Sequence, residues 1–389
     1  MKPCKIIQIV TKLELGGAQV IVLDLCRKLI AENMEVILIT NDEGILVPDA
    51  KAIKNLKIYF VPELDRKINI KKDIKCLITL SKILKKEKPY IVHTHSSKAG
   101  ILGRLAARIN KVPIVVHTIH GFAFNESQNA FYNKFIVFLE RLSARWADIL
   151  IAVSYDVMLK GQHKNIGRED QYRVICNGVD ISLLRNIKID KNNKIKELNL
   201  DASFPIIGMI ACLKPQKSPQ DFVKVAETVL QKNKNAQFIL IGDGILRNEV
   251  EMLINNYELE DNVHLLGWRR DIPDLLSIMD IFVLTSLWEG LPLTVLEAMT
   301  CKKPVVVTNI DGNKDIVIDG QNGFLCEPGN IKQMAEKIIY LIENPYYAET
   351  MGLSAYRFVQ NFDKEKMLDG NIEIYKKLSR KSLNEQGVR

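Results

Sequence analysis

Residues 286–300 read Ser286-Leu-Trp-Glu-Gly-Leu-Pro-Leu-Thr-Val-Leu-Glu-Ala-Met-Thr300 and follow an apolar run, Ile281 to Leu284. That run predicts a strand buried on both faces of a parallel sheet. Gly290 lets the backbone turn close to a ligand, and Pro292 suits the first turn of a helix, where a missing N–H costs nothing. Three backbone N–H groups are expected to converge there, with the helix dipole behind them: those of Leu291, Leu293 and Thr294. The stretch therefore predicts an anion site that suits a diphosphate, and we call residues 290–294 the cradle.

Two carboxylates flank the cradle. Glu289 lies in the turn, and Glu297 lies about one and a half turns into the helix with its side chain tilted back toward the N-terminus. A carboxylate accepts two hydroxyl hydrogen bonds, which suits a ribose diol or adjacent hydroxyls of a hexose. An ordinary strand-turn-helix with two solvated glutamates would show the same spacing. Glu289 and Glu297, with seven residues between them, resemble the paired-glutamate motif of the retaining family 4 glycosyltransferases, which have the GT-B fold.

Length and composition favour an intracellular protein of two domains. The 389 residues exceed one typical core. The seven cysteines are scattered without paired-ligand spacing, so free thiols in a reducing cytosol are expected. The first residues do not resemble a signal peptide, and no run is long enough to span a bilayer. We therefore expect a cytoplasmic protein.

The formal charge of +8 is concentrated in residues 51–90, which hold twelve Lys or Arg against four acids. Apolar residues recur there at helical spacing and predict an amphipathic helix with a basic rim: Ile70, Ile74, Leu77, Ile78, Leu80 and Leu84. Such a surface favours an anionic membrane leaflet as partner. A helix packed on its own sheet with a solvated lysine face is an equal alternative. Nucleic acid is disfavoured, because no recognised motif or aromatic stacking pattern accompanies the charge.

Short β-branched runs alternate with helical stretches along both halves of the chain. This pattern predicts two Rossmann-like, doubly wound parallel-sheet domains that face each other across a cleft, the α/β class of fold. We place an N-terminal domain at 1–185, a lysine-rich linker at 186–200 and a C-terminal domain at 201–389. The resemblance implies that the first binds the acceptor and the second binds the nucleotide sugar. The last helices are expected to pack back on the N-terminal domain. The chain has neither a complete dinucleotide fingerprint nor a Walker A loop, which disfavours hydride transfer and ATP hydrolysis.

Four of the six histidines lie at two predicted strand ends, namely His93, His95, His117 and His120. With a carboxylate they would suit a zinc or iron shell, although strand-end imidazoles more often serve packing. The resemblance favours another interpretation, in which His120 meets the transferred sugar near its anomeric centre. It also places Gly16 and Gly17 in a loop that faces the donor phosphates and the acceptor.

The resemblance assigns roles to further residues of both halves. His95, Lys98 and Arg104 are expected to line the acceptor side of the cleft. In the family, an arginine and a lysine five residues later clamp the diphosphate. Lys217 matches the lysine, but Cys212 stands in the arginine's place. Lys214 is a candidate substitute for the missing arginine. Gly242 and Gly244 are expected near the diphosphate, and Trp268 and Arg269 near the nucleotide base.

Together with these observations, the resemblance implies a retaining glycosyltransferase that moves a hexose or N-acetylhexosamine from a nucleotide-diphosphate sugar, expected to be a UDP-sugar. The expected acceptor is lipid-linked or a saccharide, in cell-surface polysaccharide synthesis. No cofactor and no metal are required in this scheme, because Lys217 and the cradle would stabilise the leaving group. A nucleotide-sugar epimerase is the first alternative. A metal-dependent hydrolase built on the four histidines and a non-catalytic subunit, suggested by Cys212, remain open.

The predicted catalytic residues are His120, Lys217 and Glu289. The predicted donor-binding residues are Gly16, Gly17, Lys214, Gly242, Gly244, Trp268, Arg269, Gly290, Leu291, Pro292, Leu293, Thr294 and Glu297.

Overall fold

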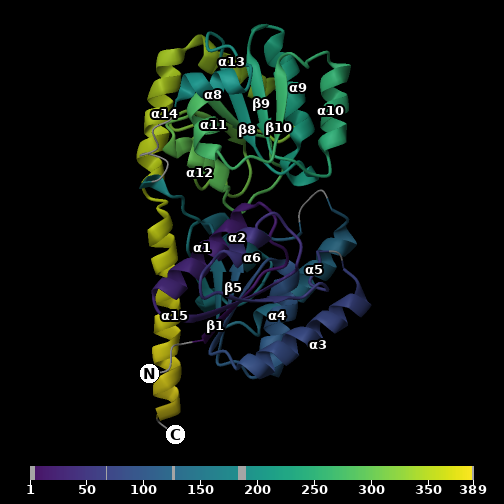
Figure 1. Cartoon of the computed structure of the whole chain (residues 1–389), viewed down its shortest axis with the longest axis vertical. Coiled ribbons are helices and arrows are strands. Elements are labelled where there is room, and N and C mark those ends of the chain that lie inside the picture. The colour runs from purple at the N-terminus through teal and green to yellow at the C-terminus, as the bar shows by residue number, and fades with distance from the viewer. Residues whose placement is uncertain (1–4, 67, 125–127, 183–189, 388–389) are drawn as a thin grey trace. The chain divides into compact units, whose positions relative to one another are not determined.

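The computed structural model describes residues 5–66, 68–124, 128–182 and 190–387 and divides the chain into two compact units (Figure 1). Unit 1 comprises residues 1–177 and 365–389, and unit 2 comprises residues 178–364. Each unit is described by itself below.

Unit 1 is built on a seven-stranded parallel sheet in the order β3-β2-β1-β4-β5-β6-β7. Its strands are β1 Lys5–Ile9, β2 Glu35–Thr40, β3 Lys57–Phe60, β4 Ile91–His95, β5 Ile114–Ile119, β6 Ile149–Ala152 and β7 Tyr172–Val174. Its helices are α1 Gly17–Ala31, α2 Val47–Lys51, α3 Ile70–Glu87, α4 Ser97–Ile109, α5 Ala130–Ala144, α6 Tyr155–His163, the short η1 Glu169–Gln171 and α15 Lys364–Gly387.

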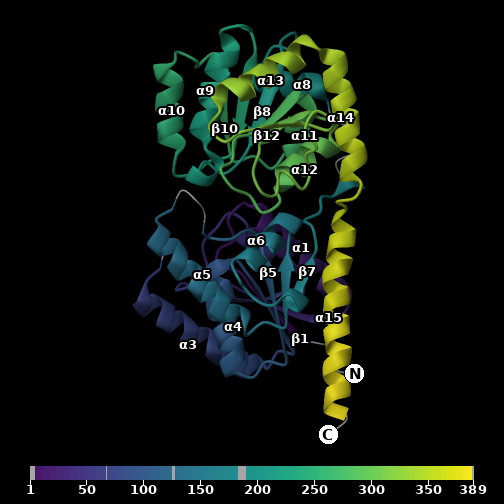
Figure 2. The ribbon, with the colours of Figure 1, turned by 180° about the vertical axis from the view of Figure 1, so that it is seen from behind.

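The two faces of this sheet differ in chemistry. On one face, Ile7, Ile9 and Ile37 form an apolar core with residues of α3 and α4 such as Leu80 and Ala106. Because strand side chains alternate, the intervening residues of the central strands point to the other face. That face carries Gln8, His93 and His95 and is covered by α15, which runs beside α1 (Figure 2).

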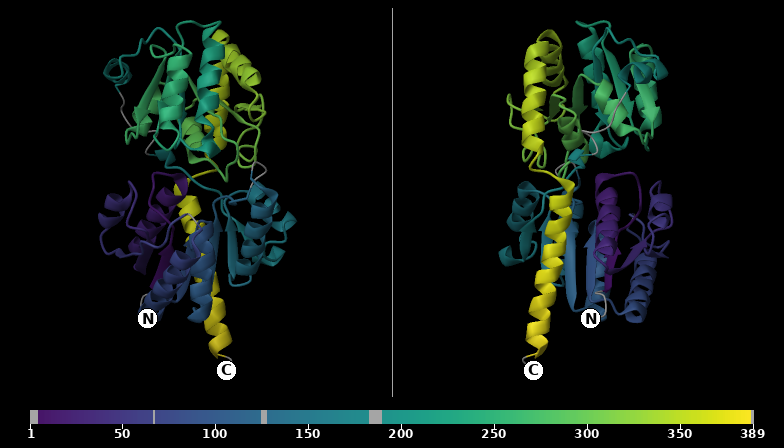
Figure 3. Two further views of the ribbon diagram at one scale, coloured as in Figure 1. Left: turned by 90° about the vertical axis from the view of Figure 1, so that its right-hand side faces the viewer. Right: turned by 60° about the vertical axis from the view of Figure 1, so that its left-hand side comes forward.

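Unit 2 is built on a six-stranded parallel sheet in the order β10-β9-β8-β11-β12-β13. Its strands are β8 Ile206–Ile210, β9 Gln237–Ile241, β10 Val263–Gly267, β11 Ile281–Leu284, β12 Val305–Thr308 and β13 Phe324–Cys326. Its helices are α8 Lys191–Glu197, the short η2 Pro215–Lys217, α9 Pro219–Leu230, α10 Arg247–Asn256, α11 Ile272–Ile278, α12 Leu293–Thr300, α13 Ile331–Glu343 and α14 Pro345–Val359. Figure 3 shows helices on both faces of the sheet in each unit.

Strand order reverses once in each sheet, between β1 and β4 in unit 1 and between β8 and β11 in unit 2. In open parallel sheets ligands bind beside the carboxyl ends of the strands at such a reversal. The loops that follow these four strands are therefore where a site is expected, and they contain the glycine pair at residues 16 and 17, residues 212–217 and the cradle.

The predicted fold class, two doubly wound α/β units, is confirmed, with three local corrections. Residues 191–197 of the predicted linker form α8, whose first turn is capped by Asp190, which accepts from the Asn193 N–H at 3.1 Å. The short strand β13 was not predicted, because three residues carry too little periodicity. The change of unit falls after Asn177, eight residues before the predicted boundary, and the chain returns to unit 1 at Glu365.

None of the helices within the described residues is long and apolar enough to cross a membrane.

Candidate active site

The cradle of unit 2 lies where β11 passes into α12. The helix begins at Leu293, with Pro292 in extended conformation as its N-cap, one position later than the sequence suggested. Gly290 and Leu291 are buried beneath it. Because the first amides of a helix have no partner within it, the N-terminus of α12 presents N–H donors at the reversal of strand order.

Lys217 and Glu289, 72 residues apart in sequence, meet in an ion pair at the mouth of the cradle. Their side chains are 15% and 7% exposed, so the pair is largely shielded from water. Ser286 Oγ donates to Glu289 at 2.6 Å, which fixes the carboxylate from the other side. The loop after β8 therefore holds the turn after β11 through a charge pair.

Backbone and amide contacts strengthen this link between the two loops. The Leu287 N–H donates to the Gln216 carbonyl at 2.8 Å, and Gln216 Nε2 donates to the Trp288 carbonyl at 2.8 Å. The Thr285 hydroxyl donates to the Lys217 and Ser218 carbonyls at 2.8 and 2.9 Å. The sequence does not reveal the roles of Thr285, Ser286 and Gln216, since a polar residue beside a motif carries no signal of its own.

Glycines let neighbouring loops approach the cradle. Gly312 has φ +82°, and a Cβ on it would lie 2.4 Å from the Gly290 carbonyl oxygen. Gly242 has φ +130°, and a Cβ there would lie 2.0 Å from the Ala211 carbonyl oxygen, so the loop after β9 packs on the loop after β8. Gly244 makes a similar approach to Leu213. Only glycine fits such contacts without displacing backbone.

Glu297 lies on α12, half-buried, and no described residue gives its carboxylate a hydrogen bond or ion pair. Burial raises the pKa of this carboxyl to about 7. A carboxylate in this setting gains from a ligand that brings hydroxyl donors to it.

The remaining predicted residues of unit 2 lie in the loops after β8 and β10. Cys212 and Lys214 are partly exposed in the loop after β8. Trp268, after β10, is 37% exposed. Arg269 donates to Asp271 at 2.6 and 2.8 Å and to Glu197 at 2.6 Å, so its guanidinium is held by carboxylates and its pKa is raised.

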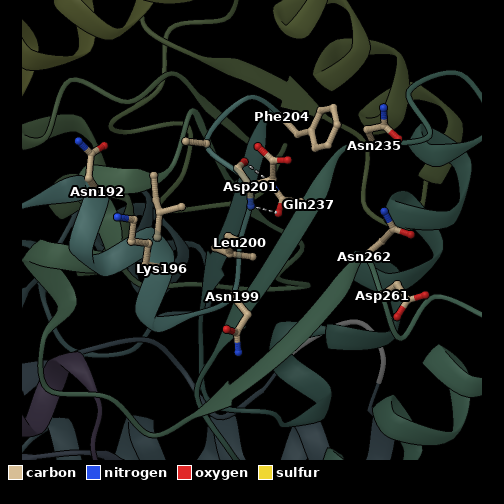
Figure 4. Close-up of a pocket in the computed structure, with 12 residues that line it drawn as sticks. Asn192, Lys196, Asn199, Leu200, Asp201, Phe204, Asn235, Gln237, Asp261 and Asn262 are labelled. Atoms are coloured by element: carbon tan, nitrogen blue, oxygen red, sulfur yellow. Dashed lines mark hydrogen bonds between the residues drawn. The ribbon is translucent and has the colours of Figure 1, made fainter.

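Unit 2 also has a cavity of about 560 Å³, whose lining residues are drawn in Figure 4 and include no residue of the cradle. Its lining comes from α8 and from residues at or just before the starts of β8, β9 and β10, including Asp201, Gln237 and Asn262. Because all six strands run parallel, this cavity lies at their amino ends, whereas the cradle lies at a carboxyl end. We assign it no part in the candidate site.

Four of the predicted residues of unit 1 lie at the carboxyl ends of β1, β4 and β5 or in the loops that follow them: Gly16, Gly17, His95 and His120. Gly16 is the N-cap of α1, and Gly17 is its first residue. His95 ends β4, and its Nδ1 lies 3.1 Å from Nε2 of His120, which follows β5. The loops after β1 and β4 also meet, with 2.7 Å between the Thr11 and Ser96 hydroxyl oxygens. The structure thus brings His95 and His120 together near the glycine loop.

Two of the three predicted acceptor contacts are engaged elsewhere in unit 1. Arg104 is fully buried on α4 and donates to Glu140 of α5 at 2.8 Å. An acceptor role for this side chain is therefore corrected to a structural one, because a buried, paired guanidinium presents no open surface. Lys98 is 13% exposed and pairs with Asp73 of α3 at 2.6 Å.

The four clustered histidines do not gather around a point that a metal would occupy. His93 contacts Tyr375 and Thr118, and His117 contacts Thr94, so their ring nitrogens are used in hydrogen bonds. Within the described residues, no three His, Cys, Asp or Glu side chains form a group suited to a metal ion. Burial lowers the pKa of all four imidazoles, to about 3 for His93 and about 4 for His120.

Comparison with known proteins agrees with this arrangement. The model of Glycosyltransferase Family 4 matches residues 15–183, and that of Glycosyl transferases group 1 matches residues 190–358. The chain is 35% identical over 373 residues to the UDP-Gal:alpha-D-GlcNAc-diphosphoundecaprenol alpha-1,3-galactosyltransferase of Escherichia coli, covering 93% of this chain and 94% of that protein. It is 28% identical over 330 residues to the capsular polysaccharide biosynthesis glycosyltransferase CapM of Staphylococcus aureus, covering 82% and 85% of the two chains.

Among solved structures, Anabaena Alr3699/HepE in complex with UDP and glucose superposes with a TM-score of 0.83 at 22% identity, covering 96% of this chain and 100% of that one. The protein is a two-domain transferase with the GT-B fold. It belongs to the glycosyl transferases group 1, in glycosyltransferase family 4.

Proposed function

We propose that this glycosyltransferase moves a hexose or N-acetylhexosamine from a UDP-sugar to a hydroxyl of a lipid-linked or saccharide acceptor, with retention of anomeric configuration, in the synthesis of a surface polysaccharide. The single observation that carries the proposal is the Lys217–Glu289 pair at the cradle, with the unpaired Glu297 on the helix behind it. The names of the relatives support the substrate classes. The E. coli relative is named for a UDP-sugar and a lipid diphosphate, the S. aureus relative for capsular polysaccharide, and the Anabaena protein was solved with UDP and glucose.

The cradle and Lys217 would act on the leaving diphosphate. Departure of UDP places negative charge on the β-phosphate, and oriented N–H donors with a shielded ammonium stabilise such charge. Glu297 would accept the ribose hydroxyls, and Glu289 would hold the transferred sugar while orienting Lys217. His120 would contact the sugar from unit 1. This scheme draws on protein groups alone, and we propose that it needs no metal ion.

The first test offers the purified protein UDP-galactose, UDP-glucose, UDP-N-acetylglucosamine and UDP-N-acetylgalactosamine with a polyprenyl diphosphate-linked N-acetylglucosamine acceptor. We expect sugar transfer with one donor, unchanged in EDTA, and NMR of the product should show the donor's anomeric configuration. An inverted product would overturn the mechanism. A modified, epimerised sugar released without acceptor would favour the epimerase, and loss of activity in EDTA would overturn metal independence.

The position of Cys212 favours one second candidate, a non-catalytic subunit. Its thiol stands in the loop after β8, where it cannot supply the paired donors of a guanidinium. If wild-type protein transfers no sugar with any donor while Cys212→Arg does, the second candidate replaces the first.

We also propose that unit 1 binds the surface of an anionic membrane, where a lipid-linked acceptor would reside. On α3, Leu80 and Leu84 are buried, whereas Ile70, Ile74 and Ile78 form an exposed stripe at 75%, 55% and 49%. A second stripe on α5 contains Phe131, Phe135, Phe138 and Leu142. Exposed cations flank these stripes: Lys71, Lys72, Lys75, Lys82, Lys85, Lys86, Lys134, Arg141 and Arg145. Apolar stripes rimmed by cations are typical of helices that lie in a lipid interface.

Co-sedimentation with vesicles tests this surface. We expect binding to phosphatidylcholine vesicles containing phosphatidylglycerol, release by high salt, and weaker binding of Phe131→Ser/Phe138→Ser. Tyr346→Ser is the matched control, because Tyr346 is 83% exposed on unit 2 and Phe131 is 82% exposed on unit 1. Equal binding of the two variants would contradict the assigned surface.

A further inference from the structure

A continuous chain of hydrogen bonds connects the C-terminal helix to His120. Tyr375 of α15 contacts both His93 Nδ1 and, at 3.1 Å, Gln8 Nε2. Gln8 Oε1 lies 2.8 Å from His95 Nε2, and His95 Nδ1 lies 3.1 Å from His120 Nε2. Tyr375, Gln8, His93 and His95 are buried, so water does not compete for these bonds.

The polarity of this chain follows from the Gln8 amide. Its Nε2 can only donate, so it donates to the Tyr375 oxygen, and its Oε1 can only accept, so it accepts a proton held on His95 Nε2. A neutral imidazole has one N–H, which leaves His95 Nδ1 as an acceptor. His95 Nδ1 therefore accepts from an N–H on His120 Nε2.

The other branch is consistent with the same polarity. The Tyr375 O–H, having accepted from Gln8, donates to His93 Nδ1, and His93 Nε2–H then donates to the Thr118 hydroxyl at 2.7 Å. Each imidazole of the network, in His93, His95 and His120, is thus the neutral tautomer protonated at Nε2. Burial favours neutral imidazoles, since it lowers the pKa of His93, His95 and His120.

The chain of hydrogen bonds ends at His120 Nδ1. His120 Nδ1 is buried and has no hydrogen-bond partner among the described residues. By the polarity derived above, it carries a lone pair and no proton. A buried acceptor left unpaired costs about 1–3 kcal/mol, which a ligand hydroxyl would recover on binding.

We propose that Gln8, His95 and Tyr375 are positioning residues that hold His120 in the Nε2–H tautomer, so that its Nδ1 accepts a hydrogen bond from a hydroxyl of the transferred sugar. That the hydroxyl belongs to a transferred sugar rests on the proposed function. The tautomer of His120 does not depend on it. The opposite orientation of the Gln8 amide would reverse every bond in the chain and turn His120 Nδ1 into a donor. The two polarities make opposite demands on the sugar, because a hydroxyl would then have to accept.

The tautomer is measured in the free protein by long-range ¹H–¹⁵N NMR of histidine-labelled chain, with His120 assigned by its loss in His120→Gln. We expect the His120 Nδ1 resonance of an unprotonated nitrogen and the Nε2 resonance of a protonated one. A protonated Nδ1 in the wild-type chain would overturn the inference, whatever the enzymatic activity.

Tyr375→Phe tests the role of the distant helix. Without the Tyr375 hydroxyl, Gln8 Nε2 loses its acceptor, and the Gln8 amide can take either orientation. We therefore expect His120 to populate both tautomers. The kcat/KM for the UDP-sugar should fall roughly three- to tenfold, the value of one hydrogen bond, while UDP alone binds as before. Gln8→Met, which removes the amide itself, should mix the His120 tautomers in the same way and gives a second reading if Tyr375→Phe does not fold.

The matched control is Tyr172→Phe. Tyr172 is a buried tyrosine of unit 1 whose hydroxyl donates to the Ile166 carbonyl at 2.7 Å, outside the network. It should lose stability comparably and leave both the His120 spectrum and kcat/KM near wild type. A wild-type His120 spectrum in both Tyr375→Phe and Gln8→Met would overturn the positioning role. A correct tautomer in a protein that transfers no sugar would support the network and count against the proposed function alone.

Discussion

Glu297 is the residue at which ligand binding and proton binding are expected to be coupled. Its pKa is about 7 in the folded chain, above its ordinary value of 4.5, because burial disfavours the charged form. The folded state therefore binds more protons than the unfolded state between those values. Stability attributable to this group is present below pH 4.5, is lost as the pH rises toward 7, and stays lost above it.

Glu297→Gln should remove that dependence. We expect the variant to be more stable than wild type at pH 8, by about 1–3 kcal/mol, and equal to it near pH 4 in chemical denaturation. Its affinity for UDP should fall about ten- to a hundredfold, because a charge-assisted hydrogen bond to the ribose is lost. A variant that binds UDP normally would remove Glu297 from the ribose site.

Lys217 is expected to carry both stability and turnover. Lys217→Met leaves the shielded Glu289 without its cation and should cost about 3 kcal/mol. Turnover should fall about a hundredfold or more through loss of the leaving-group cation. Adding Glu289→Gln should restore much of the stability without restoring turnover.

A lysine of the adjacent helix gives the control for this change. Lys224 is 44% exposed and pairs with Asp221, so Lys224→Met should change stability by less than about 1 kcal/mol and leave turnover intact. Comparable losses in the two variants would show that Lys217 acts only as surface charge.

At the level of elements, the glycine of the loop after β12 shapes the cradle by contact. Gly312→Ala introduces a Cβ at 2.4 Å from the Gly290 carbonyl oxygen and should weaken UDP binding at least tenfold by displacing that turn. Gly320 also has positive φ, +72°, but nothing lies within 4 Å of its Cβ position. Gly320→Ala should therefore show the backbone strain alone, about 1–2 kcal/mol, with normal UDP affinity by calorimetry. Equal UDP affinity in the two variants would refute the contact.

The strands were predictable from sequence because apolar runs such as Ile281 to Leu284 are buried on both faces. The cradle was predictable because its parts are local to one strand-turn-helix. The network behind His120 was not, since Gln8 and Tyr375 are 367 residues apart and each looks ordinary in its own segment. Arg104 was misassigned because sequence does not show that Glu140 would be buried beside it.

At the scale of the whole molecule, the first and last residues of unit 2 contact each other. The Val179 N–H donates to the Phe362 carbonyl at 2.9 Å, the Lys364 N–H donates to the Val179 carbonyl at 3.0 Å, and the Lys364 ammonium pairs with Asp180 at 3.0 Å. A unit whose ends meet, and whose core lies within one continuous segment, has what it needs to fold alone.

A fragment of residues 178–364 should therefore melt cooperatively and be stabilised by UDP, as followed by thermal shift. A fragment of residues 1–177 should fail to fold, because Met367, Leu368, Ile372 and Tyr375 of α15 would be missing from its core. Supplying 365–389 through a short linker should restore it. A stable fragment 1–177 would contradict this dependence.

The return of α15 to unit 1 sets an order on biosynthesis. Tyr375 leaves the ribosome 255 residues after His120, which is on the order of 13–50 s at the usual rates of translation. Throughout that interval unit 1 lacks α15, and the network behind His120 lacks Tyr375, although Gln8 and His95 have already been made. The nascent chain can therefore form the cradle of unit 2 before α15 completes the hydrogen-bond network behind His120 in unit 1.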